Sequence, residues 1–573
     1  MKENKKMKKI FLFTSIAALS LTSLTGCIKE IEPQTNYVTV DQAGNAPGSF
    51  ANFVEAITNT MAGKFVYNAS SMQPYDYGYT SFFLMRDVMG QDIACEDTGN
   101  EWYTTWYTCG TGLGPLYAVC QYPWTYFYGW IKACNDVLTL AGPEPSPSQY
   151  SGVGIAYAMR AMFYMDLARM FAQKSYAMDL NAETVPLVLE TTAVGDLSSN
   201  PRATNEVMWA QILSDLDKAE QYLADYKRSD KYTPDVSVVY GLKARAYLTM
   251  ENWAQAEEYA KLAQSGYTML TEDQYTSRST GFNTPDGNNS WMFAVRFKSD
   301  DPCILNNDAD SSWGSQMIVE VSASGCGYAS NYGSPKRIDY HLYQTIPDTD
   351  FRKKCYVDFA IDEMDEEEAI AALSAYSDAP EGLLTTAAAT TSKAVGGLEL
   401  KFRPAGGEHA NQYAAFTVSV PLMRVEEMML IEAEAAGMQS EGRGISLLTS
   451  FAQSRDPEYV YGTHTNDNYG STRATGFQNE VWWQRRVELW GEGFAMYDIK
   501  RLDKGVIRSY AGTNHPAGYR WNYGGYNTNA GNTYPDWMDF CIVGTETDYN
   551  AACTNNPTPI MPTSDSEEYV WPN

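Results

Sequence analysis

The stretch YGLKARAYLTMENWAQAEEYAKLA, residues 240–263, decides the fold class. Tyr240, Ala244 and Tyr247 recur at the spacing of one helical face, and a polar turn follows them. Trp253 then opens a second stretch in which alanines repeat at helical spacing. Small residues on two neighbouring helices allow close antiparallel packing, as in a tetratricopeptide pair. The segment therefore predicts a helix-turn-helix unit.

Helical periodicity extends outward from this unit along much of the chain. We expect helices over 155–173, from Thr204 as N-cap to Leu223, in a second pair between Met423 and Gln453, and from about Asn479 to Arg501. The face of the helix after Thr204 is predicted to carry Val207, Ile212, Leu216, Ala219 and Leu223. Regions rich in Gly, Asn, Ser and aromatic residues interrupt the helices at about 67–123, 277–359 and 509–573. The sequence thus predicts one mainly α-helical domain over 49–573, with tetratricopeptide-like helix pairs, a loop-rich face and a few short strands.

The N-terminus has the features of a lipoprotein signal. Lysines precede the apolar stretch Ile10 to Leu21, which is too short to span a bilayer. This stretch leads to Leu24-Thr25-Gly26-Cys27, which resembles the bacterial lipobox. We expect residues 1–26 to be a signal peptide, Cys27 to be lipidated and residues 27–48 to form a tether. The alternative is an ordinary secretory signal that ends near a cysteine.

Composition excludes several classes of function. The formal net charge of −28 argues against nucleic acid, whose phosphates require a basic surface, and against an anionic lipid surface. No nucleophile elbow, P-loop or His-Glu-x-x-His motif is present, so an enzyme is not expected. The four histidines are isolated and there is no Cys-x-x-Cys, so no metal site or cofactor is predicted. Asp308 and Asp310 have part of the calcium-loop spacing, but Trp313 stands where glycine is needed, and this stretch is interpreted as a polar loop.

Cysteine usage leaves two readings open. Nine cysteines remain besides Cys27, so at least one is unpaired. Export permits disulfides, and free buried cysteines that behave as small hydrophobic residues are an equal alternative.

Several blocks, in order, resemble the SusD/RagB family of surface lipoproteins that capture nutrients for outer-membrane transporters. The blocks are Trp124 to Asn135, Arg160 with Tyr164 to Phe171, Pro201 to Leu216, Asp348 to Arg352, Arg424 to Ala435, Arg485 to Arg501, and Pro559 to Pro562. Gln484, Gly491 and Ala495 depart from the family pattern. The paired charges in these blocks, Asp166, Arg169, Arg424, Glu427, Glu488, Glu492 and Asp498, are predicted to hold the scaffold together.

The resemblance implies a lipid-anchored outer-membrane protein that faces the cell exterior, binds a glycan and hands it to a TonB-dependent, SusC-like transporter. A sugar site combines aromatic rings, against which C–H faces pack, with polar groups that bind hydroxyls. Such a mixture occurs in Asp97, Asn100, Trp102, Trp106 and Tyr107, and again in Trp313, Tyr328 and Tyr332. We expect these residues to bind the ligand.

Three alternatives remain open. A RagB-like protein captures peptides, a glycosidase needs only two carboxylates that are close in space, and a lid would lack a direct ligand site. The sequence does not specify the sugar, its linkage or its length.

Overall fold

The computed structural model describes residues 48–63, 73–95, 102–109, 113–279, 282–283, 288–323, 325–387, 395–523, 534–535, 538–559 and 562–571. The chain divides into two units, Met1–Ser49 and Phe50–Asn573. The helices and strands described here belong to the second unit, except that α3 begins at Ser49.

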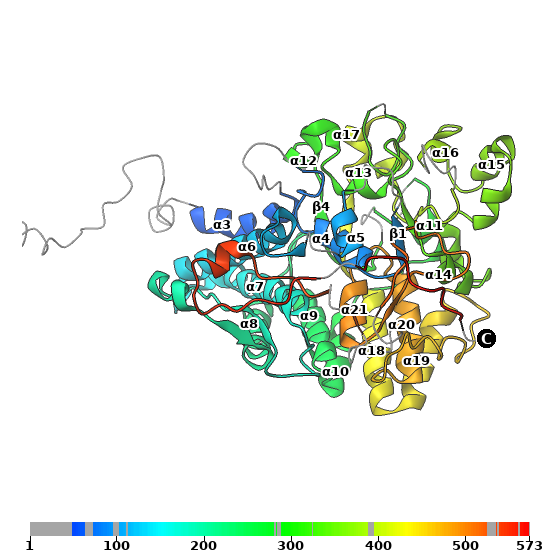
Figure 1. The fold of residues 1–573 in the computed structure, drawn as a ribbon. Helices are drawn as coiled ribbons and strands as arrows, with labels where there is room; N and C mark the ends of the chain where they lie inside the picture. The colour runs from blue at the N-terminus through cyan, green and yellow to red at the C-terminus, as the bar shows by residue number, and fades with distance from the viewer. Residues whose placement is uncertain are drawn as a thin grey trace, which may run out of the picture. The chain divides into compact units, whose positions relative to one another are not determined.

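Helices dominate this unit (Figure 1). The longer ones are α3 (Ser49–Asn59), α4 (Ser81–Val88), α6 (Ala118–Ala141), α7 (Tyr150–Phe171), α8 (Asn205–Leu223), α9 (Val236–Thr249), α10 (Trp253–Gln264), α15 (Glu366–Leu373), α18 (Val425–Gln439), α19 (Glu441–Gln453), α20 (Gly476–Glu488) and α21 (Ala495–Arg501). The short ones are α5 (Thr104–Thr108), α11 (Glu272–Thr276), α12 (Pro302–Leu305), α13 (Trp313–Met317), α14 (Tyr340–Thr345), α16 (Leu383–Ala387), α17 (Gln412–Ala415) and α22 (Gly544–Thr547).

The long helices pack in sequence, each against the next. Helix α6 lies on α7, α7 on α8, α8 on α9, α9 on α10, α10 on α18, and α18 on α19 and α20. In Figure 1 this row runs below the segments that carry α12, α13, α15, α16 and α17. The prediction of a mainly α-helical protein in which helix pairs support a loop-rich region is confirmed.

Small residues allow the helix pairs to pack closely. Ala244 of α9 and Ala256 of α10 are fully buried in the predicted first pair. In the second pair, a Cβ on Gly444 of α19 would lie 2.3 Å from the Cα of Gly437 in α18. Because real Cβ contacts are never that short, glycine is required at this crossing.

Two details of the predicted helices are wrong. The last helix is broken: α20 ends at Glu488 and α21 begins at Ala495, because Gly491 and Gly493 between them have φ of 75° and 83°. Thr204 does cap α8, where its side chain accepts from the Val207 N–H, but the Val207 side chain is exposed. Val207 lies in the first turn, at the side of the buried face.

Strands are short and form four antiparallel pairs among the described residues. These are β1 (Ile93–Cys95) with β5 (Lys336–Ile338), β2 (Glu183–Pro186) with β3 (Arg202–Thr204), β4 (Trp291–Arg296) with β6 (Ser419–Arg424), and β7 (Val506–Ile507) with β8 (Asn522–Tyr523). The β4–β6 pair joins the central irregular segment to α18, since β6 runs directly into that helix.

A buried ion cluster connects the C-terminal half of the scaffold. Glu488 pairs with Arg352, Arg424 and Arg455 at 3.0 to 3.2 Å, and all four side chains are almost fully buried. Arg424 also binds Glu492 at 2.9 Å. The other predicted charges pair too: Glu427 with Arg245, Asp498 with Arg485, and Asp166 with Arg169. These residues were predicted from their helical spacing to hold the scaffold together, and in the structure they form ion pairs.

Two further properties concern the described residues. Nine cysteines are present there, and all are buried free thiols, so the disulfide reading is not supported. Within the same ranges, no helix is long and apolar enough to cross a membrane.

Candidate functional site

The predicted ligand residues do not share one environment. Asp97 and Asn100, like Cys27, lie outside the described residues. Trp106, Tyr107 and Trp313 are buried in the core, Tyr328 is 9% exposed, and Trp102 is 37% exposed. The expectation that all these rings are available to a ligand is therefore corrected for Trp106, Tyr107 and Trp313, and Tyr328 exposes only a small part of its surface.

Packing explains the three buried rings. The Trp106 ring lies edge-on against Tyr75, with centroids 5.4 Å apart. The Tyr107 hydroxyl is hydrogen-bonded to Nδ1 of His515, and the Arg508 guanidinium covers the Tyr107 ring at 4.4 Å. Trp313 packs edge-on against Phe402, with centroids 4.8 Å apart. These contacts hold the core beneath the loops.

Three other predicted rings come together across more than 200 residues of sequence. Trp102 stands just before α5, and its ring lies edge-on to Tyr328, with centroids 5.9 Å apart and an interplanar angle of 79°. Tyr328 in turn lies 5.1 Å from Tyr332. The two predicted strips, one near residue 102 and one near residue 330, thus form one aromatic cluster, in which Trp102 is exposed, Tyr332 is half-buried and Tyr328 is nearly buried.

The loop that carries Tyr328 and Tyr332 is anchored on Asp310 and Ser315. The Asp310 carboxylate accepts hydrogen bonds from the Gly327 N–H at 2.5 Å and from the Ser315 hydroxyl at 3.2 Å. Ser315 Oγ also accepts from the Tyr328 N–H at 3.0 Å. Since Asp310 and Ser315 are themselves buried, the two tyrosines are held by rigid partners.

Tyr413 adds a further ring to this surface, and it was not among the residues predicted from the sequence. Tyr413 in α17 is 39% exposed, and its hydroxyl donates to the Asp308 carboxylate at 2.9 Å. Burial raises the pKa of Tyr332, and the Asp310 and Asp308 carboxylates add to this effect. We call Trp102, Tyr328, Tyr332 and Tyr413 the aromatic face. No local pattern marks Tyr413, because its position depends on contact between α17 and the η5 turn (Asn307–Ala309).

The η5 turn is strained. Asn307, Asp308 and Ala309 all have left-handed backbone conformations, with φ of 49°, 52° and 64°. Each such non-glycine residue costs on the order of 1–3 kcal/mol, and conformations of this kind cluster at ligand sites. The exposed Asp308 carboxylate of this turn accepts a hydrogen bond from the Tyr413 hydroxyl.

Electrostatics keep the hydroxyl groups neutral. Burial and the Asp310 carboxylate raise the pKa of Tyr328 to about 12. Burial also raises the pKa of Asp310 to about 6. At neutral pH the face therefore combines neutral tyrosine hydroxyls, which both donate and accept, with carboxylates that accept.

The acidic turn has no metal-binding arrangement in the described part of the chain. Asp310 is committed to Gly327 and Ser315, and Ser312 caps α13 by accepting from the Ser315 N–H. No group of three His, Cys, Asp or Glu side chains suited to a metal is found among the described residues. The interpretation of this stretch as a polar loop stays a prediction.

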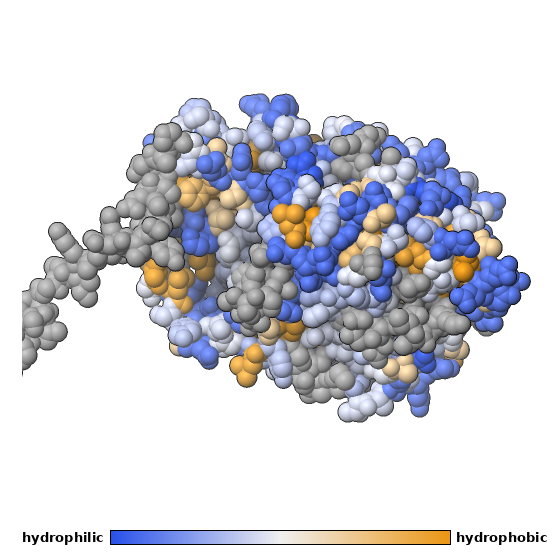
Figure 2. Space-filling view, turned by 90° about the horizontal axis from the view of Figure 1, so that it is seen from above, coloured by the Kyte–Doolittle hydropathy of each residue, from blue (hydrophilic) through white to orange (hydrophobic). Residues whose placement is uncertain are grey.

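Figure 2 views the molecule from the side that carries α12, α13 and α17 in Figure 1. Hydrophobic residues there form small, separate patches among hydrophilic ones. Broad apolar patches mark protein-binding surfaces, whereas a sugar needs separate rings among polar groups.

Comparisons with known proteins agree with this architecture. Residues 49–248 match the SusD-like family model described as "Starch-binding associating with outer membrane". No curated protein is a significant match.

Solved structures extend the likeness over nearly the whole chain. A SusD-like carbohydrate binding protein from Bacteroides vulgatus is 21% identical with a TM-score of 0.65, covering 88% of this chain and 97% of that one. Surface glycan-binding protein A from Bacteroides thetaiotaomicron, solved with laminarihexaose, is 14% identical with a TM-score of 0.62, covering 89% and 99%. Residues 49–248 are thus similar to the SusD-like family model, and the whole chain has the fold of these solved SusD-like structures.

Proposed function

We propose that this protein binds an oligosaccharide or polysaccharide on the aromatic face and delivers it to a TonB-dependent outer-membrane transporter. The observation that carries the proposal is the cluster of Trp102, Tyr328 and Tyr332, together with the exposed Tyr413 and Asp308, which are hydrogen-bonded to each other. Rings at several tilts offer surfaces for sugar C–H groups, and the hydroxyls and carboxylate beside them bind sugar hydroxyls.

The charge of the protein favours a neutral ligand. The chain carries a formal net charge of −28, and Asp308 is exposed at the face itself. A polyanionic glycan is repelled at long range by such a surface, whereas a neutral glycan is not. Two structural relatives support the carbohydrate assignment, since one was solved with laminarihexaose and another is named a laminarin binding SusD-like protein.

We propose that the protein binds the glycan and does not hydrolyse it. A glycosidase needs one carboxyl group to act as acid and a second as nucleophile or base, both facing the sugar. At the aromatic face Asp308 is exposed, but Asp310 is buried and accepts from the Gly327 N–H and the Ser315 hydroxyl. The second carboxylate is therefore occupied in holding the loop.

The binding test uses the mature protein on a panel of neutral and acidic glycans, followed by calorimetry with the best ligand. Trp102→Ala is expected to weaken binding about 30-fold, which corresponds to about 2 kcal/mol for a stacked ring. The matched control is Tyr549→Ala, which removes a ring that is 80% exposed in the turn after α22. We expect the control to bind like the parent.

Three results would contradict the proposal. Unchanged affinity in Trp102→Ala, Tyr328→Ala and Tyr413→Ala would remove the aromatic face as the site. Binding from a peptide mixture, with no glycan bound, would favour peptide capture. Release of reducing sugar from a bound glycan would show an enzyme.

Delivery to a transporter requires attachment at the outer membrane through Cys27. Cys27→Ala is expected to abolish labelling with palmitate and to release the protein from membranes, with an unchanged melting temperature. A labelled, membrane-bound variant would contradict the anchor. Co-purification of the parent, solubilised from outer membranes, with a TonB-dependent transporter tests the partner, and its absence would contradict delivery.

A further inference from the structure

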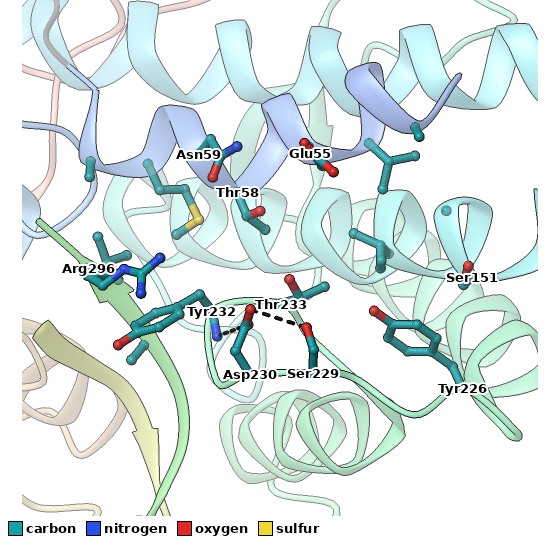
Figure 3. A pocket seen from close by; sticks show the side chains of 18 of the residues that line it. Glu55, Thr58, Asn59, Ser151, Tyr226, Ser229, Asp230, Tyr232, Thr233 and Arg296 are labelled. Carbon is teal, nitrogen blue, oxygen red and sulfur yellow. Dashed lines mark hydrogen bonds between the residues drawn. The ribbon is translucent and has the colours of Figure 1, made fainter. Parts of the chain in front are cut away.

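A cavity of about 480 Å³ lies away from the aromatic face, between α3 and the segment 226–233 (Figure 3). Helix α3 forms one wall with Glu55, Thr58 and Asn59. The opposite wall comes from segment 226–233 and from Arg296 at the end of β4. We call this cavity the α3 cleft. Its volume falls within the range of about 300–1,000 Å³ typical of small-molecule sites.

The Tyr232 ring of the α3 cleft is held in place. The Tyr232 hydroxyl is hydrogen-bonded to Ser419 at 3.0 Å, and its backbone N–H donates to the Asp230 carboxylate at 2.9 Å. The Arg296 guanidinium lies 4.5 Å from the centre of the Tyr232 ring. Figure 3 shows Tyr226 at the other end of the same wall, with Ser229 and Asp230 between the two tyrosines. Fixed rings lose little conformational entropy when a ligand binds.

Both hydrogen-bond donors and hydrogen-bond acceptors line the α3 cleft. Arg296 is exposed and lines the cleft. Asp230 is also exposed, and burial together with the Asp230 carboxylate raises the pKa of Tyr226. A guanidinium donates and a carboxylate accepts, which suits neighbouring sugar hydroxyls. The charged residues that line the cleft are Glu55, Asp230, Asp301, Arg296 and Lys298, so both signs are present and neither dominates.

We propose that the α3 cleft is a second saccharide site, which takes a neutral mono- or disaccharide unit. It deepens the proposed function by adding a site built from different residues. The rings of Tyr226 and Tyr232 pack against the sugar, Arg296 donates to hydroxyls, and Asp230 and Asn59 bind the remaining ones.

The chain itself limits the separation of the two sites. Asp301 lines the α3 cleft and Asp308 is hydrogen-bonded to Tyr413 of the aromatic face, and the two aspartates are only seven positions apart in the sequence. An extended chain spans at most about 3.6 Å per residue, so their Cα atoms lie within about 25 Å of one another. A single glycan chain of several sugars can therefore contact both sites, which raises avidity without new contacts.

The test follows the Met61 methyl group by NMR, because Met61 lines the α3 cleft. The mature protein is labelled at its methionine methyl groups, and Met61→Leu identifies the signal. A panel of neutral disaccharides, namely laminaribiose, maltose, cellobiose, xylobiose and mannobiose, is titrated. We expect at least one to shift the Met61 signal saturably, both in the parent and in Trp102→Ala, which separates this site from the aromatic face.

Two variants locate the binding. Arg296→Ala, at an exposed position, is expected to weaken the disaccharide affinity reported by the Met61 signal at least 5-fold. Tyr226→Ala is expected to weaken this affinity at least 10-fold. Arg473→Ala, which removes an arginine from the loop before α20, serves as the matched control and is expected to leave the response unchanged. The proposal is overturned if no disaccharide of the panel shifts Met61, or if Arg296→Ala and Tyr226→Ala respond like the control. A shift that disappears in Trp102→Ala also overturns it, and leaves the proposed function standing.

Discussion

Glu488 holds the buried ion cluster together, and its replacement tests the electrostatic account of the scaffold. Glu488→Gln keeps the shape of the side chain and removes its charge. In the parent, Glu488 faces Arg352, Arg424 and Arg455, and it has no solvent exposure. The ion pairs of the cluster join the carboxylates Asp350, Glu426, Glu488 and Glu492 to the cations Arg352, Lys401, Arg424 and Arg455. These charges balance, so the variant leaves one buried positive charge uncompensated.

Breaking a buried pair by removing one partner costs about 3–5 kcal/mol. The unfolding entropy is about 2.1 cal/mol/K per residue, so about 520 residues give about 1.1 kcal/mol/K. The melting temperature of Glu488→Gln is therefore expected to fall by about 3–5 °C at pH 7, measured by scanning calorimetry. Glu367→Gln, at an exposed position in α15, is the control and should melt with the parent.

The pH dependence gives a second, independent check. Burial alone would raise the pKa of Glu488, but Arg455, Arg424, Arg352 and Lys401 outweigh it and hold the pKa well below the usual glutamate value of 4.5. A carboxyl with a lowered pKa stabilises the fold above its unfolded pKa and loses this contribution as the pH falls toward the folded pKa. The difference in melting temperature between the parent and Glu488→Gln should therefore become smaller below about pH 4.5. Equal melting temperatures of the parent and Glu488→Gln at pH 7 would refute the reasoning. A difference in melting temperature that stays constant down to pH 3 would also refute it.

Three further predictions follow from burial and hydrogen bonding. Trp106→Ala should lose about 3–5 kcal/mol of unfolding free energy in denaturant titration, whereas Trp102→Ala should stay within about 1 kcal/mol of the parent, and the reverse order would contradict the assigned exposures. Ala256→Trp should destabilise by about 1–3 kcal/mol or more through overpacking of α9 on α10, and unchanged melting would contradict close packing. Because burial raises the pKa of Asp310 to about 6, glycan affinity should fall about 3- to 10-fold from pH 7 to pH 5 as the bond to Gly327 loses its charge, and Asp310→Asn should abolish this dependence.

The helical scaffold could be predicted from local sequence because helical spacing reports burial directly. In α8, Ile212, Leu216 and Ala219 recur at intervals that place them on one face, and all are fully buried. The break after Glu488 was missed, although Gly491 and Gly493 stand there, because charged and apolar residues continue at helical spacing on both sides. Periodicity therefore identifies helices more reliably than it identifies where they stop.

The candidate site was only partly predictable, since composition marks aromatic residues and does not report which side of a ring faces solvent. Trp102 and Trp106 stand four residues apart in the same aromatic segment, yet one is 37% exposed and the other is fully buried. Their difference arises from Tyr75, which packs edge-on against Trp106, and from Tyr328, which meets Trp102 at the surface. Both partners lie far enough away in sequence that no local pattern contains them.

The residues that complete the aromatic face were hidden for the same reason. Asp310 was interpreted as part of a polar loop, and its function in the structure is to bind the Gly327 N–H and so hold two tyrosines in place. Tyr413 becomes part of the surface only because α17 reaches the strained turn at Asp308. A binding surface assembled from loops depends on such long-range contacts, and the helical row supplies the rigid frame on which they are made. The part of the molecule that is easiest to predict from sequence is therefore the part that positions the ligand residues, while the choice of exposed rings is made by tertiary contacts.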